Sequence, residues 1–353
     1  MKIAVYTIAL NEEQFVADWA ESARDADYLL IADTGSTDRT VELAESLGVN
    51  VIHVGIKPWR FDLARNAALA ALPTDIDYCI ALDMDEVLLP GWRAELEKVP
   101  TGTTRPRYTY TWSWNEDGSP GLQYEGDKIH TRHGYKWKHP VHEVATTYGG
   151  LLEVQNRIKL EIHHHADNSK PRSQYLPLLK MSVDEDPSDD RNAHYYAREL
   201  YFYGMYPESA AEFKRHLGLP RAVWPAERAA SMRYLGKIEH DNAEYWFQKA
   251  VAEAPGRREP WVDLANLYYT QERWDSCLGA AETALAITEK PLDYLCEADA
   301  WGFAPHDFAA IAAYRLGQFG TAVHHAQKAL EASPEDERLV RNLLECEKAL
   351  RPS

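Results

Sequence analysis

Two kinds of hydrophobic spacing alternate over the first 90 residues of the chain. Short runs of β-branched and aliphatic residues predict strands at residues 2–9, 28–32, 50–54 and 78–82. Between them, apolar residues recur every three or four positions and predict helices at residues 12–26, 40–47 and 61–71. This alternation of strand and helix is typical of a doubly wound α/β sheet, whose ligand binds beyond the carboxyl ends of the strands.

The spacing changes after residue 100. From Tyr108 to Trp114, aromatic residues alternate with small polar ones at period two, as in an antiparallel strand with one buried or ligand-facing side. Turn-forming pairs at residues 117–118 and 149–150 bound further short strands. We therefore expect a mixed sheet rather than a purely parallel one.

The second half of the chain repeats a helix-turn-helix pattern. A segment that begins at Ala243 matches one that begins at Cys277, 34 residues later, which is the tetratricopeptide period. Weaker copies begin at Glu199 and Ala313. An insertion is expected at residues 292–305, and a final helix at residues 335–350 would cap an all-α repeat domain.

The chain of 353 residues is acidic, with 38 basic and 55 acidic side chains and a net charge of -17. This balance argues against nonspecific binding to DNA or anionic membranes as the main activity. Residues 101–140 are locally basic, so the sequence is still compatible with one specific anionic acceptor. The four cysteines are scattered without a CxxC pair, and we expect a cytoplasmic protein without a signal peptide or a membrane span.

Two carboxylates follow the predicted strand at residues 78–82. Asp83 and Asp85 stand two positions apart on extended chain and can converge on one hard cation, such as the Mn²⁺ or Mg²⁺ that offsets the charge of a nucleotide diphosphate. An isolated pair of this kind is also typical of a solvated acidic loop. Here polar residues also follow the two preceding strands, at residues 7–12 and 33–38, so we expect all three segments to surround one cleft.

Four segments of the N-terminal part resemble the inverting nucleotide-sugar glycosyltransferases of family 2, which have the glycosyltransferase A fold. They are IALNEEQFVADWAESA from Ile8, ADTGSTDRTVELAESLGV from Ala32, FDLARNAALA from Phe61 and ALDMDEVL from Ala81. The subgroup that the chain looks most like carries a C-terminal tetratricopeptide array. The resemblance implies a catalytic domain over residues 1–170 and a helical repeat domain over residues 171–353. It also implies metal-dependent transfer of a sugar, most simply a hexose, from a UDP-sugar to a polypeptide or saccharide.

The resemblance assigns several residues to the donor nucleotide. Thr7, Asn11 and Glu12 would contact the nucleoside, and Asp33 would accept a hydrogen bond from the uracil ring. Arg65 would face the base or the diphosphate. Seen alone, Glu12 could equally be a helix cap and Arg65 part of a surface ion pair.

The resemblance also implies a metal site. Asp83 would lie near the ribose and the metal, and Asp85 would bind Mn²⁺ or Mg²⁺ directly. The three adjacent histidines at residues 163–165 cannot all reach one ion from a strand, because neighbouring side chains point to opposite faces. The frame of the family's motif selects His164, although the two residues after it differ from the aromatic residue and glycine of that motif.

Glu143 is the candidate general base, because a His-Glu pair occurs at this place in the resembling subgroup. Inverting transfer needs a carboxylate to take the proton of the acceptor. Glu86 and Asp127 remain alternatives. As a structural alternative, any one of the histidines could simply stabilise the fold.

The sequence specifies the binding site of the acceptor less clearly than that of the donor. Five aromatic residues would either border the acceptor or pack as a core between the sheet and the repeats: Trp112, Trp114, Tyr124, Tyr135 and Trp137. The groove of a repeat array suits an extended peptide, a saccharide is equally compatible, and base-modified DNA stays open. Two rival functions are a noncatalytic repeat scaffold and a nucleotidyltransferase, but the segment after the first strand lacks the glycines of a phosphate loop.

Overall fold

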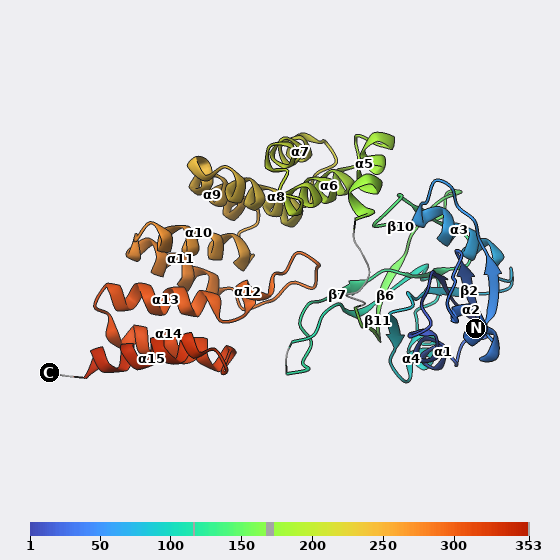
Figure 1. Cartoon of the computed structure of the whole chain (residues 1–353), viewed down its shortest axis with the longest axis horizontal. Coiled ribbons are helices and arrows are strands. Elements are labelled where there is room, and N and C mark those ends of the chain that lie inside the picture. Colours follow the sequence, from blue (N-terminus) through green and yellow to red (C-terminus); the bar gives the residue numbers. More distant parts are fainter. Residues whose placement is uncertain (116, 167–172, 352–353) are drawn as a thin grey trace. The chain divides into compact units, whose positions relative to one another are not determined.

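The computed structural model describes residues 1–115, 117–166 and 173–351, which form two compact units, Met1–Ser182 and Val183–Ser353 (Figure 1). The predicted domain boundary at residues 170 and 171 lies outside the described residues. We call the two parts unit 1 and unit 2 and describe each by itself.

Unit 1 is built on a five-stranded sheet with the order β3-β2-β1-β4-β8. The bounds of these strands are β1 Ile3–Ala9, β2 Tyr28–Asp33, β3 Asn50–His53, β4 Tyr78–Ala81 and β8 Ile129–Thr131. The first four are parallel, and β8 pairs antiparallel with β4. Because β1 lies between β2 and β4, the segments after these three strands meet at one edge of the sheet.

Helices cover both faces of this sheet. They are α1 Val16–Ser22, α2 Thr40–Ser46, α3 Phe61–Ala71 and α4 Trp92–Leu96. The face that carries Ile3 and Val5 packs against α1, α2 and α4, whereas the face that carries Ala4 and Tyr6 packs against α3. This is the burial expected of parallel strands that are covered on both sides.

A second sheet of four strands has the order β5-β11-β6-β7. The bounds of its strands are β5 Glu86–Leu88, β6 Arg105–Thr111, β7 Gln123–Gly126 and β11 Gln155–His164. A separate pair of strands is formed by β9 Tyr135–Lys138 and β10 Val144–Thr147. β11 pairs in parallel with β6 and antiparallel with β5, which places His164 opposite Glu86. The predicted mixed α/β fold is confirmed.

Helix α1 is shorter than the predicted helix over residues 12–26. The backbone N–H groups of Asn11 and Glu12 donate to the hydroxyl oxygens of Ser36 and Thr40, at 2.9 and 2.7 Å. These bonds hold the chain in a loop, so the helix begins only at Val16. Loop contacts from a distant part of the sequence therefore override the local helical spacing.

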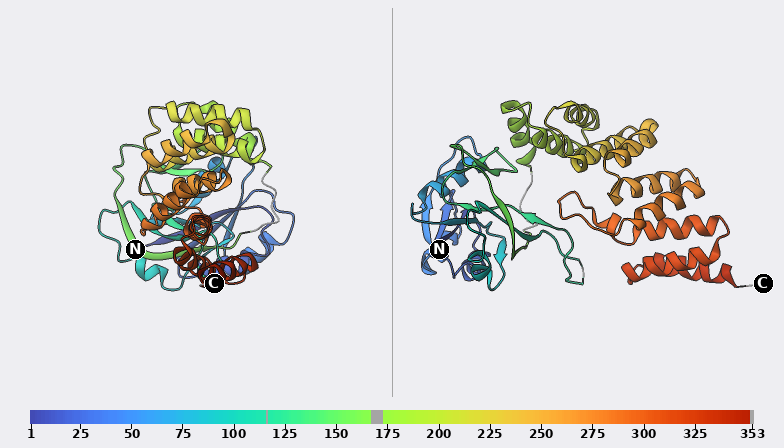
Figure 2. Two further views of the ribbon diagram at one scale, coloured as in Figure 1. Left: turned by 90° about the vertical axis from the view of Figure 1, so that its left-hand side faces the viewer. Right: turned by 180° about the vertical axis from the view of Figure 1, so that it is seen from behind.

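Unit 2 is helical, as predicted. After α5 (Tyr175–Glu185), which crosses the division between the units, its helices are α6 Asp190–Phe202, α7 Tyr206–Gly218, α8 Pro225–Ile238, α9 Ala243–Glu253, α10 Arg258–Thr270, α11 Trp274–Ala286, α12 Ala298–Trp301, α13 Ala304–Arg315, α14 Phe319–Ala332 and α15 Glu337–Leu350. Successive helices stack in pairs within the unit (Figure 2).

The 34-residue period places equivalent residues in the core of unit 2. Phe247 and Ala250 on α9 and their counterparts Ala281 and Ala284 on α11 are all buried. The alanines at three of these positions let neighbouring helices approach closely. The expected insertion is the long connection between α11 and α13, where the described residues form only the short α12.

Candidate active site

Asn11 joins the loops that follow β1 and β2. Its backbone N–H donates to Ser36 Oγ, and its Oδ1 accepts a hydrogen bond from the N–H of Thr37 at 2.8 Å. Its φ of 55° lies in the left-handed region, which asparagine tolerates better than most residues. Asn11 therefore holds the loops after β1 and β2 together. Its predicted contact with a nucleoside stays a prediction.

Asp33 ends β2 and is 3% exposed. Its carboxylate accepts hydrogen bonds from the N–H groups of Ser36 and Gly35, at 3.0 and 3.1 Å, and lies 3.2 Å from His53 Nδ1. Burial disfavours the charged form, but the bonds from Ser36, His53 and Gly35 outweigh it and hold the pKa of Asp33 below its ordinary value. Asp33 is thus an ionised acceptor at the edge of the sheet.

Thr7 and Glu12 are buried at the same edge. Thr7 lies inside β1 with no exposed surface, and its hydroxyl donates to the carbonyl oxygen of Ile8 at 3.2 Å. Glu12 is 8% exposed and follows Asn11 in the first loop. Their predicted contacts with a nucleoside stay predictions.

Asp83 lies between two cations. Its Oδ1 accepts a hydrogen bond from Arg65 Nη2 and its Oδ2 one from Lys128 Nζ, both at 2.6 Å. Arg65 also forms an ion pair with Glu143 through its Nε, and Lys128 reaches Glu86 Oε1 at 2.6 Å. These five side chains form one network, which links α3, the segment after β4, the start of β5, the β7–β8 connection and the β9–β10 connection.

The network sets the charge of its carboxyl groups. Burial opposes ionisation of Asp83, but Arg65 and Lys128 hold the pKa of Asp83 well below its ordinary value. Burial raises the pKa of Glu86 despite the ion pair with Lys128, and the negative charge of Asp83 adds to this rise. Of these two carboxyl groups, Asp83 is therefore the one that is held in its ionised form.

One nitrogen of the Arg65 guanidinium has no hydrogen-bond partner among the described residues. This nitrogen, Nη1, is buried. The guanidinium also lies 5.0 Å from the ring centre of Trp137, which restricts its movement. A buried donor of this kind is stabilised when an anion approaches it.

Asp85 and His164 face each other beside this network. Asp85 Oδ2 lies 3.3 Å from His164 Nε2. His164 Nδ1 lies 2.9 Å from the carbonyl oxygen of Trp112, so Nδ1 carries a proton and donates it there, leaving Nε2 directed at Asp85. Burial opposes protonation of His164, but Asp85 and the Trp112 carbonyl raise its pKa. Asp85 and His164 are the two side chains here that could hold a cation together.

The two neighbouring histidines take other directions. His163 Nε2 lies 2.9 Å from Glu161 Oε1. The backbone N–H of His165 donates to the carbonyl oxygen of Asp85 at 2.7 Å, and this bond fixes the distance between β11 and the loop after β4. The imidazole beside the Asp85 carboxylate is thus that of His164.

The five aromatic residues of the predicted acceptor side separate into two groups. Trp112 and Trp114 are 44% and 36% exposed, and the Trp112 ring stacks on His164 at 4.2 Å. Tyr135 and Trp137 belong to the core beneath α3. Tyr124 packs half-buried against the other core. Only the first two are therefore available beside the Asp85–His164 pair.

The alternatives to Glu143 as base occupy different surroundings. Glu86 is 1% exposed and is held by Lys128 and by the backbone N–H of Asp83, at 2.6 and 2.9 Å. Asp127 is half-exposed, with its carboxylate 3.8 Å from Arg105 Nη1. Lys128 itself was not predicted as a site residue, since its only signal in the sequence is its place in the basic segment 101–140.

The structure thus has a mixed α/β domain followed by a helical repeat domain, and comparisons with known proteins show what each part resembles. Residues 4–99 match the family model described as glycosyl transferase family 2. A TPR repeat-containing protein of Synechococcus elongatus is 24% identical over 346 residues, which cover 94% of this chain and 76% of that protein.

Two further similarities each cover about a third of the chain. A protein of Rickettsia conorii, described as an uncharacterized glycosyltransferase, is 32% identical over 108 residues, or 30% of this chain and 37% of that protein. Glucosyl-3-phosphoglycerate synthase from Mycobacterium tuberculosis, solved with Mn²⁺, UDP and glucosyl-3-phosphoglycerate, is 27% identical over 31% of this chain and 44% of that chain, with a TM-score of 0.26. A TM-score this low does not define a shared fold. The family resemblance therefore rests on the sequence matches and on the sheet of unit 1.

Residues 4–99 thus resemble the family 2 glycosyltransferases, and they are followed by a tetratricopeptide-like helical domain. The predicted family resemblance is confirmed. Among the helices of the described residues, none combines the length and the apolar character needed to cross a membrane.

Proposed function

We propose that the chain transfers a hexose from a UDP-sugar to a polypeptide or saccharide acceptor, with Mn²⁺ or Mg²⁺ as cofactor. The observation that carries the proposal is the buried Arg65 guanidinium, which two carboxylates hold in place while its Nη1 lacks a partner among the described residues. A guanidinium in this setting can bind one further anion, such as a diphosphate. It stands at the carboxyl edge of a parallel sheet, where nucleotides bind in α/β folds.

The donor set beside Arg65 fits a divalent cation. Within the described ranges, no three His, Cys, Asp or Glu side chains gather closely enough to hold a metal by themselves. Asp85 and His164 would therefore hold the ion together with oxygens of the diphosphate, and one or two protein ligands are common when phosphates complete the shell. A carboxylate with an imidazole suits Mn²⁺ better than Mg²⁺. When bound, the ion would offset the charge of the leaving diphosphate.

Asp83, Asp33 and the first loop would position the donor. The carboxylate of Asp83 is held by Arg65 and Lys128, so it would orient these cations and approach the ribose rather than serve as a freely available metal ligand. Asp33 would accept the N–H of uracil. Asn11 would keep the loops around the nucleoside in place.

Glu143 is the proposed general base. It would take the proton of the acceptor's nucleophilic atom while that atom attacks the anomeric carbon, and the electrons of the breaking C–O bond would pass to UDP. Glu143 also forms an ion pair with Arg65, so it would help to direct the guanidinium at the diphosphate. Developing negative charge on the leaving group would be stabilised by Arg65.

The substitution Glu143→Gln separates these roles. Loss of a general base lowers turnover by about 10²- to 10⁴-fold, whereas affinity for the nucleotide should change little, because the amide oxygen of glutamine can still accept the hydrogen bond from Arg65. The matched control is Glu153→Gln, because Glu153 also pairs with an arginine of unit 1, Arg105. Turnover of Glu143→Gln close to that of the control would rule out Glu143 as the base.

A panel of substrates tests the proposed reaction class. The protein with Mn²⁺ should release UDP slowly from at least one UDP-hexose without acceptor and faster when the right peptide or oligosaccharide is added. Acceleration only by base-modified DNA would assign a nucleic acid acceptor instead. No release from any sugar nucleotide would favour a repeat scaffold, and consumption of a nucleoside triphosphate would favour a nucleotidyltransferase.

A further inference from the structure

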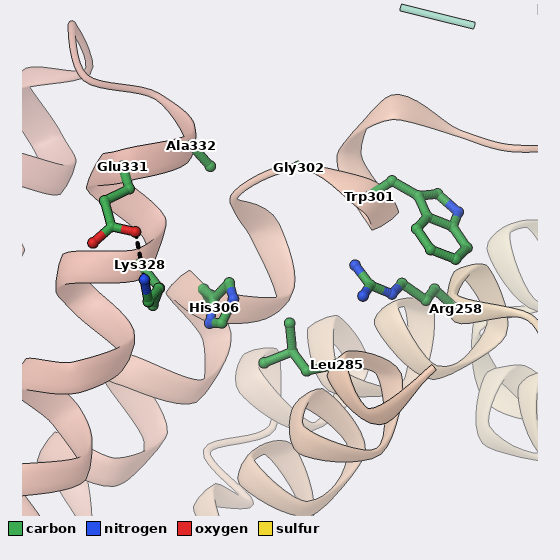
Figure 3. Close-up of a pocket in the computed structure, with 8 residues that line it drawn as sticks. All are labelled: Arg258, Leu285, Trp301, Gly302, His306, Lys328, Glu331 and Ala332. Atoms are coloured by element: carbon green, nitrogen blue, oxygen red, sulfur yellow. Dashed lines mark hydrogen bonds and ion pairs between the residues drawn. The ribbon is translucent and has the colours of Figure 1, made fainter. Parts of the chain in front are cut away.

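Unit 2 contains a hollow of about 420 Å³, built by five helices of the repeat array (Figure 3). The residues that matter here are Arg258 at the start of α10, Trp301 on α12, His306 on α13, and Lys328 and Glu331 on α14. Its volume lies within the range of about 300–1,000 Å³ that is usual for small-ligand sites. The insertion between α11 and α13 supplies Trp301, so a regular repeat would lack this wall.

Arg258 and Trp301 are fixed in place on one side of the hollow. Arg258 Nε donates to the carbonyl oxygen of Ile287 at 2.7 Å, and its guanidinium carbon lies 4.2 Å from the ring centre of Trp301. Trp301 Nε1 donates to Glu259 Oε1 at 3.0 Å. The two terminal nitrogens of Arg258 are thereby held beneath the indole before any ligand binds, which lowers the entropic cost of binding.

The charge of Arg258 is not balanced by an acidic neighbour. In the part of the chain that the structure describes, no carboxylate forms an ion pair with Arg258, since Glu259 is engaged by Arg257 at 3.2 Å and by Trp301. Burial lowers the pKa of Arg258, and the negative charge of Glu259 offsets this only in part. A partly desolvated cation of this kind gains free energy from an anion.

The opposite side of the hollow adds a second cation. Lys328 forms an ion pair with Glu331 at 2.6 Å, but their side chains are 45% and 62% exposed, so the pair adds little stability and Lys328 can turn to a ligand. His306 lies between Lys328 and Arg258 in the view of Figure 3. Burial and then the charges of Arg258, His324 and Lys328 lower the pKa of His306, and the negative charge of Glu331 offsets this only in part.

We propose that this hollow binds a compact anionic ligand through a carboxylate or phosphate group held by the terminal nitrogens of Arg258, with Lys328 as a second contact. A guanidinium fork matches the spacing of the oxygens in both groups. The indole of Trp301 covers one face of the guanidinium, so the anion approaches in the guanidinium plane. This proposal rests on residues of unit 2 alone and does not depend on the proposed function.

Calorimetric titration of the full chain tests the site with two probes, inorganic phosphate and glutarate. At least one should bind saturably with a Kd below about 1 mM. The substitution Arg258→Gln should weaken binding at least about 10-fold, the loss expected for a charged hydrogen bond. Saturation by phosphate alone would assign a phosphate ligand, and saturation by glutarate alone a carboxylate such as an acidic peptide carries. Failure of both to saturate by about 10 mM would overturn the proposal.

Two controls separate a specific site from general charge. Arg341→Gln removes an exposed arginine of α15, with 69% of its side chain exposed, and should leave the Kd unchanged. Equal weakening by Arg258→Gln and Arg341→Gln would overturn the proposal. If Arg258→Gln does not fold, Lys328→Gln on the exposed rim should still weaken binding about 3-fold or more, and an unchanged Kd would count against the site. UDP release should be the same in all three variants, whatever the outcome for the transferase.

Discussion

Lys128 is the side chain on which the charge balance of the candidate active site depends. It is the cation shared by Asp83 and Glu86, and Glu86 is almost fully buried. Without Lys128, two carboxylates would stand close together with only Arg65 to balance Asp83. The position of Asp83 at the edge of the sheet therefore requires a residue from the β7–β8 connection, 45 positions further along the chain.

Replacement of Lys128 by methionine keeps most of the side-chain volume and removes the charge. We expect the free energy of unfolding to fall by about 3 kcal/mol, because an unpaired buried carboxylate is left behind. Urea unfolding followed by fluorescence measures the change. The control is Lys98→Met, which removes an exposed lysine paired with Glu95 and should cost less than about 0.5 kcal/mol. Equal losses in both variants would contradict the stabilising role of Lys128.

At the scale of elements, close packing between consecutive helices explains the regularity of unit 2. Gly236 on α8 faces Phe247 on α9, and a Cβ atom at this glycine would lie 2.4 Å from the Phe247 ring. A Cβ atom at Gly279 on α11 would meet no neighbouring atom of the described residues within 4 Å. Gly236 is therefore needed for close helix packing, whereas Gly279 is not, although both lie within helices.

Substitution of each glycine by alanine should change stability in opposite directions. Gly236→Ala inserts a methyl group into a filled space and should cost about 1–3 kcal/mol. Gly279→Ala meets no neighbour and should add about 0.5–1 kcal/mol through the higher helix propensity of alanine. Thermal unfolding followed by circular dichroism compares them. A stabilised Gly236→Ala variant would show that α8 and α9 are not packed closely there.

The sequence predicts local elements better than their long-range pairing. The strands β1 to β4 and helices α2 and α3 fall within about two residues of their predictions, because periodicity and turn residues are local signals. The pairing of β11 with both β5 and β6 has no local signal, because it joins segments that lie far apart in the sequence. Asp83 and Asp85 could be selected from their spacing after a strand and His164 from the family resemblance, whereas a single lysine at position 128 carries no such signal.

At the scale of the whole molecule, buried histidines connect stability to pH. Burial lowers the pKa of His130 in unit 1 and of His216 and His325 in unit 2 to about 4. His216 is also held by Ser231, whose hydroxyl lies 2.9 Å from its Nδ1. Well above a pH of about 6.5 these groups are neutral in both the folded and unfolded chain and do not make stability depend on pH.

Stability should therefore fall as the pH drops from about 6.5 towards about 4. In this window the unfolded chain binds protons that the folded chain does not, at a cost of about 1.4 kcal/mol per pH unit for each histidine. Thermal unfolding at neutral pH and at about pH 5 measures the loss, and His216→Gln should reduce the slope while the exposed His240→Gln should not. An unfolding temperature that is the same at both pH values would contradict this account.

The proposed function depends on unit 1 as a whole, because a cation held by Asp85 and His164 would join it to a UDP-sugar beside Arg65. Calorimetric titration of UDP into the full chain, with and without Mn²⁺, tests it most directly. The account predicts binding that requires Mn²⁺, a loss of at least about 10-fold in affinity for Asp85→Asn, and no change for Asp75→Asn, which alters an exposed aspartate paired with Lys2. UDP affinity that is independent of Mn²⁺, or equal in the two variants, would contradict it.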